Sequence, residues 1–396
     1  MKVVVVGGGA SGLMCAIRIA SRGIDVTLLE KNNNTCKKLL VTGNGKCNYF
    51  NSDMDIKHYH SSDNNLVSDI ISEGNINLLK QFFHNIGIVP RIKNGYYYPY
   101  SNTATTLKNL LLLEAKRLNI NIKTDTIVTK IIKEQQFILK TNSDDIICDK
   151  VVLALGSRAY IKDEYNGYRL LEELGHHIIK PLPALVMLEG SGNYFKDWVG
   201  IRTDAIVSLY SDNEFIDKQE GEVQLTNYGI SGICIMNLSG RVARMLDDGK
   251  KVSLKINFIP FISNGYDYLE ERSKLLKEKT IIEMLESIIN YKLLYAILKK
   301  CHINDKCTWK DLNKEDKNLL VENIFNFKLD IVKTKDFECA QVVTGGLSLQ
   351  EVTDKLESKI VSGLFIVGEL LDVDGDCGGY NLGFAWLSGL VVGDNI

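Results

Sequence analysis

The sequence predicts an α/β protein of at least two domains. The chain has 396 residues, and single hydrophobic cores stop growing well below this length. Many of its 32 glycines gather near the two chain ends, where each cluster follows a short apolar run and precedes a helical pattern. Between the ends, a strand-like stretch is followed by a helical one. These three observations predict α/β elements at both ends and a separate region between them.

Composition and charge exclude several protein classes. Apolar residues make up 45% and charged residues 24%, with 5 prolines, so the chain is not disordered, collagen-like or of low complexity. A formal net charge of −2 and a pI of about 6.3 give no overall electrostatic reason to bind nucleic acid or an anionic membrane. We therefore expect no nucleic-acid partner and no membrane partner, although a local basic groove stays open.

The cysteines favour a reducing compartment. Nine of them lie between Cys15 and Cys377 with no CxxC pair and no zinc-site spacing, so no metal site is expected. No apolar run reaches the roughly 18 residues that a membrane span requires. Glycines interrupt the apolar start, Val3 to Val6, too early for a signal peptide. We expect a cytoplasmic protein.

The N-terminal segment matches a dinucleotide-binding fingerprint. The β-branched run from Val3 to Val6 suits a buried parallel strand. It leads into Gly7-Gly8-Gly9-Ala10-Ser11-Gly12, which satisfies G-x-G-x-x-G and opens an amphipathic helix. A second strand, residues 26–29, ends in Glu30. An ordinary strand-helix-strand turn is the structural alternative, but the elements occur in the order and register of a Rossmann-like fold.

Each part of this fingerprint has a physical role. Gly7 permits the tight turn, Gly9 lets the backbone approach a pyrophosphate, and Gly12 lets the helix pack on the strand. The helix N-terminus offers N–H groups and a partial positive charge to the same pyrophosphate. Glu30 follows Gly12 by 18 residues, where a carboxylate accepts hydrogen bonds from the hydroxyls of a ribose. The fingerprint alone does not separate FAD from NAD.

The C-terminal segment favours a flavin. A turn and short buried strand, Ser362 to Val367, lead to Gly368-Glu369, and a glycine loop then feeds an apolar helix through Trp386. Such a helix N-terminus makes a second anion site and can stabilise negative charge on the N1/O2 edge of a reduced flavin. The aspartates at 372, 374 and 376 are interpreted as shaping this turn and not as a calcium loop.

These segments resemble the flavoproteins with two dinucleotide-binding domains, in which both chain ends build one FAD domain. More narrowly, the chain resembles the bacterial NAD(P)/FAD-dependent oxidoreductases of the aminoacetone oxidase-like and BaiN-like family. Four segments carry the resemblance: KKLLVTGNGKCN at 37–48, LTNYGISG at 225–232, VTGGL at 343–347, and Gly368 to Trp386. Lys46 stands where the family usually has arginine, and Asn227 where it often has histidine.

The resemblance implies an FAD site with named contacts. Gly7, Gly9, Ala10, Ser11 and Gly12 are expected to hold the pyrophosphate, Glu30 the adenosine ribose, and Val128 the adenine through its backbone. Residues expected along the ribityl chain and flavin ring are Lys38, Leu39, Gly43, Asn44, Cys47 and Asn48. Residues expected to close the site from the other side are Gly368, Glu369, Gly379, Tyr380, Asn381 and Leu382. Lys31, Ala154 and Gly156 complete the predicted cofactor contacts.

The predicted fold is a discontinuous Rossmann-like FAD-binding domain with an inserted β-barrel-like domain and a small helical domain. The FAD domain is expected over residues 1–184 and 336–396, the inserted β domain over 185–262 and 306–335, and the helical cap over 263–305. Alternating stretches at 205–210 and 252–256 indicate strands. Apolar residues from Leu269 to Ile297 recur at helical spacing.

The expected function is that of an FAD-dependent oxidoreductase, in which hydride moves between flavin N5 and a small organic substrate. The resemblance implies either reduction of a conjugated enone, with NADH or NADPH as a transient electron donor, or oxidation of a small amine by oxygen. A flavin-dependent RNA-modifying protein and a flavin sensor are the alternatives. No catalytic residue is assigned, because bound flavin already carries the hydride chemistry. The oligomeric state is left open.

Three further motifs have structural interpretations. Cys47 and Cys377 are expected to pack or to contact the cofactor, since no closely spaced pair suited to dithiol chemistry is present. His176-His177 and His302 are interpreted as surface or loop histidines. The aromatic run from Gly95 to Tyr100 is expected either to stack on a ligand or to be a strand that turns into a loop.

Overall fold

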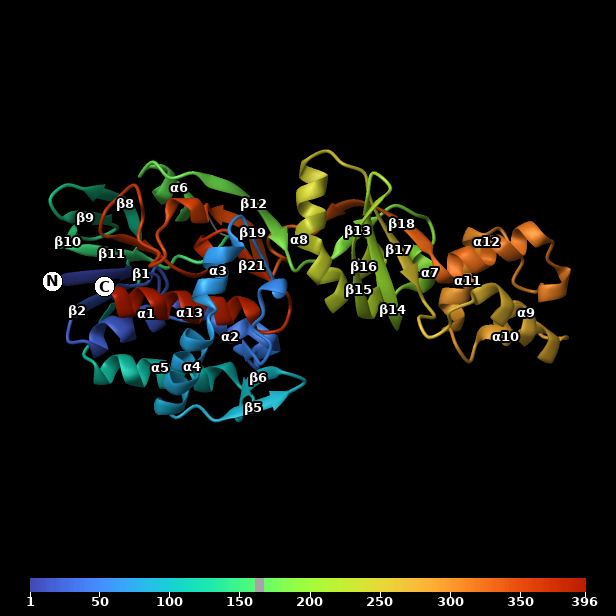
Figure 1. Cartoon of the computed structure of the whole chain (residues 1–396), viewed down its shortest axis with the longest axis horizontal. Coiled ribbons are helices and arrows are strands. Elements are labelled where there is room, and N and C mark those ends of the chain that lie inside the picture. The colour runs from blue at the N-terminus through green and yellow to red at the C-terminus, as the bar shows by residue number, and fades with distance from the viewer. Residues whose placement is uncertain (161–166) are drawn as a thin grey trace. The chain divides into compact units, whose positions relative to one another are not determined.

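The computed structural model describes residues 1–160 and 167–396 (Figure 1). The chain forms two compact units, one made of Met1–Leu182 with Val342–Ile396 and the other of Pro183–Gln341. Each unit has its own hydrophobic core. Both chain ends therefore fold into one α/β unit, and the middle of the chain folds separately.

A five-stranded parallel sheet forms the centre of the first unit. Its strands occur in the order β20 (Leu364–Ile366), β11 (Lys150–Leu153), β1 (Lys2–Val6), β2 (Asp25–Leu29) and β7 (Asn121–Lys123). Val3, Val4 and Val5 are fully buried, because α1 (Ala10–Ser21) packs on β1 and β2 and β10 (Ile146–Cys148) also contacts β1. Because β11 pairs with both β20 and β1, the C-terminal segment joins the same sheet as the N-terminal strand. The predicted Rossmann-like fold class is confirmed.

Two helices from opposite chain ends, α1 (Ala10–Ser21) and α13 (Tyr380–Asn395), lie side by side in this unit (Figure 1). A side-chain carbon added at Gly389 would lie 2.5 Å from the Ser11 carbonyl oxygen, and one added at Gly393 would overlap the Arg18 side chain. Since Gly389 faces Ser11 and Gly393 faces Arg18, the two helices run in the same direction. Their N-termini consequently point toward the same end of the unit.

The other elements of the first unit surround this sheet and helix pair. The helices are α2 (Lys37–Val41), α3 (Asn64–Ile70), α4 (Glu73–Asn85), α5 (Ala104–Arg117) and α6 (Gly167–Glu172), with short 3₁₀ helices at Thr42–Gly45, Ile56–His58, Leu349–Glu351 and Gly368–Leu370. The remaining strands are β3 (Phe50–Asn51), β4 (Tyr59–Ser61), β5 (Pro90–Lys93), β6 (Tyr96–Pro99), β8 (Val128–Lys133), β9 (Phe137–Thr141), β10 (Ile146–Cys148), β12 (Ile178–Ala184), β19 (Val342–Leu347) and β21 (Val373–Gly375).

The second unit contains a closed barrel of six strands. They occur in the order β13 (Leu188–Gly190), β16 (Gly229–Ser231), β15 (Glu214–Leu225), β14 (Arg202–Ser211), β17 (Val252–Asn257) and β18 (Phe327–Thr334). Neighbouring strands pair antiparallel. Along β14, alternate residues such as Ala205, Val207 and Leu209 are fully buried. The predicted β-barrel-like fold is therefore confirmed, and α8 (Ile233–Asp247) packs against β15.

The helical part of the second unit extends further along the chain than residue 305, the predicted end of the helical cap. Its helices are α7 (Phe195–Trp198), α9 (Gly265–Leu275), α10 (Ile281–Leu285), α11 (Tyr291–Lys300) and α12 (Lys314–Phe325), with a 3₁₀ helix at Trp309–Asp311. We expected residues 306–325 to belong to the β domain, but α12 packs on α9 and α11 through buried Leu320 and Ile324. Its side-chain pattern has a helical period, and only β18 beyond it joins the barrel.

The close packing of α1 on α13 predicts a specific effect of Gly389→Ala. The added methyl group would meet the Ser11 carbonyl at 2.5 Å, so we expect a loss of about 1–3 kcal/mol in unfolding free energy despite alanine's higher helix propensity. Gly74→Ala on α4 is the matched control, because nothing lies within 4 Å of its added carbon, and it should be neutral or stabilising. Urea unfolding followed by circular dichroism measures both variants. Equal stability of the two would contradict this account of the helix pair.

Candidate functional site

The turn after β1 is shaped by two glycines that have no room for a side chain. Gly7 has φ +111°, and a side-chain carbon there would overlap the Ala154 carbonyl. A carbon at Gly12 would overlap the Gly7 carbonyl oxygen. The Gly7 N–H donates to the Leu29 carbonyl at 2.7 Å. These contacts fasten the turn to both neighbouring strands and let α1 start directly beneath it.

Gly9 differs from its two neighbours because nothing lies within 4 Å of an added side-chain carbon. It is the N-cap of α1, it makes no side-chain capping bond, and the first turn of the helix contains no acidic residue. The first N–H groups of α1 and its partial positive charge thus stand beside open space. This arrangement fits the pyrophosphate of a dinucleotide, which is the group predicted for this turn.

Glu30 lies at the end of β2 and is 8% exposed. Its Oε2 accepts a hydrogen bond from the Gly8 N–H at 2.9 Å, and its Oε1 accepts bonds from the backbone and side-chain amides of Asn32 at 2.9 and 2.6 Å. The carboxylate is therefore held next to the glycine turn. Thr126 N–H donates to the Glu30 carbonyl at 3.0 Å, which brings the start of β8 with buried Val128 to the same end of the sheet. Exposed Lys31 follows Glu30.

The loop that follows α2 has an unusual backbone. Gly43, Asn44, Gly45 and Cys47 all have positive φ, between 54° and 81°. Only glycine adopts this conformation freely, and Asn44 and Cys47 adopt it at an energetic cost that tertiary contacts must offset. Leu39 and Cys47 are buried. The loop is thus a constrained structure within the first unit.

Lys38 connects this loop to the C-terminal segment. Its Nζ lies 2.5 Å from Glu369 Oε2 and 3.3 Å from Ser157 Oγ, and Ser157 also donates to Glu369 at 3.2 Å. Three segments far apart in the sequence meet here: α2, the segment after β11 and the segment after β20. Gly368 beside Glu369 has φ +71° and would place a side-chain carbon 2.6 Å from Ser11 Oγ. The contact places Gly368 directly against the start of α1.

A second glycine turn, residues 375–379, leads into α13. A side-chain carbon at Gly379, which has φ +94°, would lie 2.5 Å from the Phe50 carbonyl oxygen. Asn51 Nδ2 donates to the Gly378 carbonyl at 2.8 Å. Asn381 accepts from the Gly375 N–H at 2.9 Å and donates to its carbonyl at 2.7 Å. In the amide orientation that satisfies both of its polar atoms, Asn48 accepts from the Gly379 N–H at 3.3 Å.

The structure brings the sequence-predicted residues into two neighbouring groups within the first unit. The first surrounds the α1 turn and contains Gly7, Gly9, Ala10, Ser11, Gly12, Glu30 and Ala154, with Val128 and Gly156 at the adjoining strand ends. The second joins the 38–48 loop to the α13 turn and contains Lys38, Gly43, Asn44, Cys47, Asn48, Gly368, Glu369, Gly379, Tyr380 and Asn381. Leu382 is half-buried in the first turn of α13.

Sequence reasoning missed several residues that hold these groups together. Ser157 is 1% exposed and bonds to Glu369, and it directly follows predicted Gly156. Buried Asn51 lies in a two-residue strand that has too little pattern to be recognised. His58 contacts Asp376, on the far side of the chain in sequence. None of these residues belongs to a motif, so only the tertiary contacts identify them.

The polar residues that the sequence singled out elsewhere have structural roles. His176 is not a surface histidine, because its buried ring contacts Glu351 at 2.7 Å and Ser358 at 3.0 Å. Burial raises the pKa of both Cys36 and Cys47 to about 12, so neither thiol forms the reactive thiolate at neutral pH. Among the described residues, no group of three His, Cys, Asp or Glu is placed to hold a metal ion. In the same part of the chain, no helix is long and apolar enough to cross a membrane.

The segment 225–232, one of the four that carried the resemblance, lies in the barrel of the second unit. A side-chain carbon at Gly229 would overlap the Leu188 carbonyl, and one at Gly232 would overlap the Glu222 carbonyl. Trp198 Nε1 donates to the Thr226 carbonyl at 3.0 Å. Its glycines therefore allow β16 to lie close to β13 and β15.

The first unit combines a Rossmann-type sheet with a glycine turn, a buried acidic residue and a second glycine turn at a parallel helix. This is the arrangement expected of a dinucleotide-binding flavoprotein. The family comparison agrees. The model of the HI0933-like protein Rossmann domain matches residues 1–395, so the chain belongs to this family. It is an FAD-dependent oxidoreductase, and the predicted family resemblance is confirmed.

Two relatives and one solved structure illustrate the range of similarity. The chain is 33% identical over 400 residues to the 3-dehydro-bile acid delta(4,6)-reductase of Clostridium scindens, covering 99% of this chain and 98% of the relative. It is 24% identical to the ribosomal RNA dihydrouridine synthase of Haemophilus influenzae, covering 97% and 96%. The 3-ketosteroid-delta4-(5alpha)-dehydrogenase structure from Rhodococcus jostii aligns with a TM-score of 0.47 at 14% identity, covering 99% and 96%.

The contrast between Gly9 and Gly12 predicts that substitution by valine impairs cofactor binding at one position and folding at the other. Gly9 has φ −84° and open space around it, so we expect Gly9→Val to fold but to lose FAD affinity by at least about tenfold, because its side chain occupies the pyrophosphate position. Gly12→Val would overlap the Gly7 carbonyl and should prevent folding. Far-UV circular dichroism and the flavin absorbance per protein measure the two effects. A yellow Gly9→Val protein with wild-type FAD content would contradict the assigned site.

Proposed function

We propose that this protein reduces a carbon–carbon double bond conjugated to a carbonyl group in a small organic molecule, with NADH or NADPH as the electron donor. The observation that carries the proposal is the 33% identity with a 3-dehydro-bile acid delta(4,6)-reductase over nearly the whole of both chains. Dihydrouridine, the product named for another full-length relative, is also formed by saturating a double bond conjugated to a carbonyl. The two names therefore share one reaction type.

FAD supplies the hydride chemistry when it is bound. The chain's own residues must then hold the cofactor, exclude water and orient the substrate carbonyl. A hydrogen-bond donor at that carbonyl favours reduction, because negative charge develops on its oxygen as hydride adds to the far end of the conjugated system. The donor has to lie beside the flavin end of the cofactor site.

Tyr96 and Tyr98 are suited to this role. They project from the same face of β6, whereas Tyr97 between them packs edge-on against Tyr49 and Phe50. The Tyr96 ring would lie 2.9 Å from a side-chain carbon at Gly378, and the Tyr98 ring would lie 3.8 Å from one at Gly43. Each phenol therefore borders one of the two glycine loops of the proposed flavin site.

The protonation state of both phenols agrees with a donor role. Burial raises the pKa of Tyr96 and of Tyr98 above the ordinary value for tyrosine, so both hydroxyls keep their protons at neutral pH. Within the described residues, neither hydroxyl takes part in a hydrogen bond. Both are thus available to a bound carbonyl. The aromatic run from Gly95 to Tyr100 contains β6, which pairs with β5 in a β-hairpin, and we assign the run a ligand-facing role.

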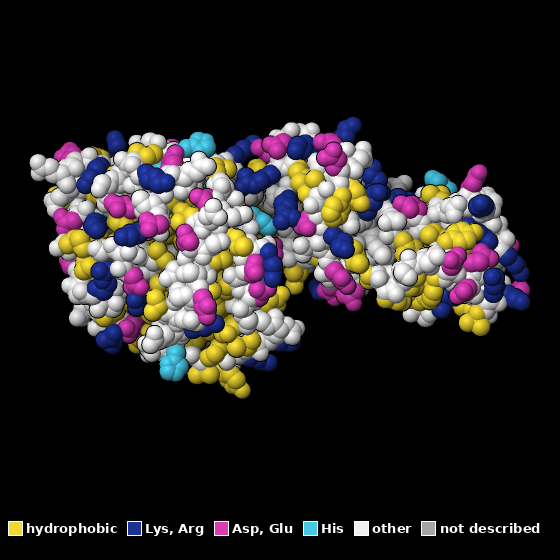
Figure 2. Space-filling view, in the orientation of Figure 1, with side chains coloured by type: hydrophobic (Ala, Val, Ile, Leu, Met, Phe, Trp, Pro, Cys, Tyr) yellow, Lys and Arg dark blue, Asp and Glu magenta, His cyan; other side chains and the backbone are white. Residues whose placement is uncertain are grey.

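An RNA substrate is the second candidate. The Haemophilus influenzae ribosomal RNA dihydrouridine synthase matches over 97% of this chain, which supports reduction of a uridine. The net charge of −2 does not favour RNA. On the face drawn in Figure 2, basic and acidic side chains are interspersed, and a binding surface for phosphates requires a concentration of basic ones.

Anaerobic stopped-flow measurement of flavin absorbance separates these candidates. We expect NADH or NADPH to bleach the flavin rapidly and a conjugated enone, such as a 4-en-3-one steroid, to restore its colour. Bleaching by a small amine and by neither nicotinamide would overturn the proposal in favour of an amine oxidase. Reoxidation by ribosomal RNA and not by enones, together with RNA retention that weakens steeply with salt, would favour the second candidate.

The tyrosine assignment predicts a loss of turnover without a loss of cofactor. We expect the double substitution Tyr96→Phe and Tyr98→Phe to lower kcat for enone reduction by about a hundredfold, the size observed when a donor to a developing oxyanion is removed. FAD content and flavin reduction by NAD(P)H should stay unchanged. Tyr100→Phe is the control, because Tyr100 is 70% exposed on the same hairpin. Wild-type kcat in the double variant would exclude both phenols.

A further inference from the structure

His58 contacts the residues on either side of positions 377–379, the last part of the glycine turn that precedes α13. The turn residues 377–379 separate Asp376 from Tyr380, the first residue of the helix. His58 Nδ1 lies 3.0 Å from Asp376 Oδ2. The His58 ring also stacks on the Tyr380 ring, with centroids 4.4 Å apart and planes inclined by 22°. A single side chain therefore fixes the residues directly before and after positions 377–379.

Backbone contacts strengthen this connection. The Asp376 N–H donates to the His58 carbonyl at 2.9 Å. The adjoining strands β4 and β21 pair antiparallel, with Tyr59 opposite Gly375 and His60 opposite Asp374. Tyr59 Oη donates to the Tyr380 carbonyl at 3.1 Å. The segment around His58 and the segment around the turn thus pack together as one structure, although His58 and Asp376 are 318 positions apart in the sequence.

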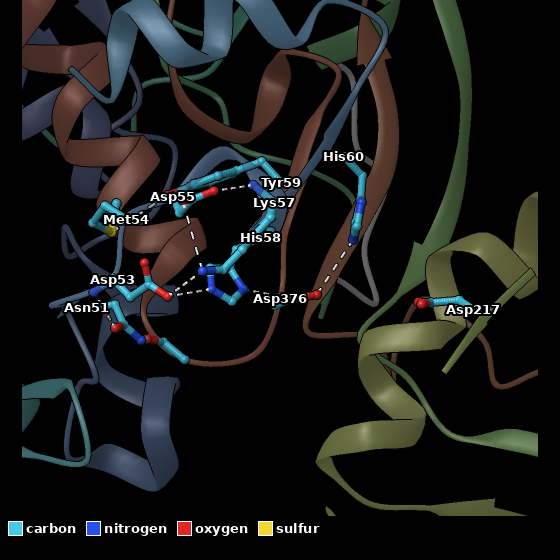
Figure 3. A network of polar contacts seen from close by, with 12 residues as sticks. Asn51, Asp53, Met54, Asp55, Lys57, His58, Tyr59, His60, Asp217 and Asp376 are labelled. Atoms are coloured by element: carbon cyan, nitrogen blue, oxygen red, sulfur yellow. Dashed lines mark hydrogen bonds and ion pairs between the residues drawn. The ribbon is translucent and has the colours of Figure 1, made fainter. Parts of the chain in front are cut away.

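Charged groups hold the His58 ring in this position (Figure 3). Its Nε2 lies 3.1 Å from Asp53 Oδ2, and Asp53 in turn pairs with Lys57 at 3.0 Å. Hydrogen bonds from Lys57 and His58 lower the pKa of Asp53, so this carboxylate is ionised at neutral pH. Asp376 also faces His60, whose Nε2 lies 3.6 Å from its Oδ1. The ring donates to both carboxylates at once when both of its nitrogens are protonated.

We propose that His58 is a positioning residue for the flavin end of the cofactor. By holding Asp376 and Tyr380 it fixes the turn between them, and with it the N-terminal N–H groups of α13. Gly378 and Gly379 have φ +136° and +94°, and two successive glycines lose the most backbone entropy when a turn becomes ordered. A turn that is already ordered binds its ligand more tightly, because the ordering cost is met during folding. This inference rests on the proposed cofactor site and not on the proposed substrate.

Two substitutions separate the two contacts of the His58 ring. His58→Phe keeps an aromatic ring to stack on Tyr380 and removes the donors to Asp376 and Asp53. His58→Asn keeps a donor placed like Nδ1 and removes the ring. His84→Phe is the matched control, because His84 is an exposed histidine on α4 of the same unit. The full-length chain is used throughout, first as the holoprotein and then after removal of FAD.

The readout compares FAD with ADP, which represents the adenosine half of the cofactor. We expect His58→Phe to raise the Kd for FAD about tenfold, the loss of a hydrogen bond to a charged group, and to speed FAD release from the diluted holoprotein. The Kd for ADP should stay at the wild-type value. His58→Asn should recover part of the FAD affinity. The visible circular dichroism of bound flavin should change in His58→Phe and not in His84→Phe.

Several outcomes would overturn the proposal. Wild-type FAD affinity in His58→Phe excludes the positioning role. An equal loss of FAD and ADP affinity, with a lower melting temperature of the FAD-free protein, would show a general structural role instead. If His58→Phe fails to fold, Asp376→Asn tests the same contact and should weaken FAD binding without affecting ADP. Glu30→Gln should weaken the binding of both FAD and ADP. If it weakens neither, the cofactor site is refuted, whereas wild-type FAD affinity in His58→Phe alone refutes only the role of His58.

Discussion

The contact between α1 and α13 is the interaction on which the rest of the first unit depends. Gly389 and Gly393 bring the backbones of two helices from opposite chain ends close together, and the same C-terminal segment adds β20 to the sheet beside β11. Because the helices run in the same direction, both N-termini face one end of the unit. Ser11 lies opposite Gly389. At about 1.5 Å per residue, the part of α13 from Tyr380 to Gly389 is about 14 Å long, so α13 begins about 14 Å before the point where it meets Ser11. The two partial positive charges are thereby spaced along the proposed cofactor site.

Glycines serve three separate purposes in this site. Gly7 and Gly12 allow backbone segments to touch, Gly378 and Gly379 supply a conformation with positive φ, and Gly9 leaves open space at the start of α1. A sequence motif does not distinguish these purposes, but the surroundings of each glycine do. Asn44 and Cys47 adopt positive φ without being glycine, and such strain persists where surrounding contacts over-determine a local structure. The strained segment lies at the proposed flavin loop.

Polar contacts over long sequence distances hold the two glycine turns in register. Lys38, Ser157 and Glu369 form one cluster, with Lys38 and Glu369 separated by 331 positions. Asn48 and Asn51 bond to the α13 turn at Gly379 and Gly378. The Lys38 and Glu369 side chains are partly exposed, so their pairing adds little stability. Its importance lies in orienting the loops and not in the energy of the ion pair.

The sequence by itself determined the local parts of this protein. The run from Val3 to Val6, the glycines of the first turn and the terminal Glu30 were predictable because a Rossmann-type turn depends on neighbouring residues whose spacing is visible in the chain. The period of Leu269 to Ile297 likewise indicated helices. It did not show where the helical part ends, because α12 joins it through packing and not through a continuous pattern.

Only the tertiary structure decided which separate segments meet. His58 could not be assigned a role from the sequence, because its partners Asp376 and Tyr380 lie more than 300 positions away and belong to no shared motif. His176 was predicted to be a surface or loop histidine, because its partners Glu351 and Ser358 lie far from it in the sequence. Local geometry follows from the order of residues, whereas a site made from distant segments follows from the sheet order and helix packing that bring them together.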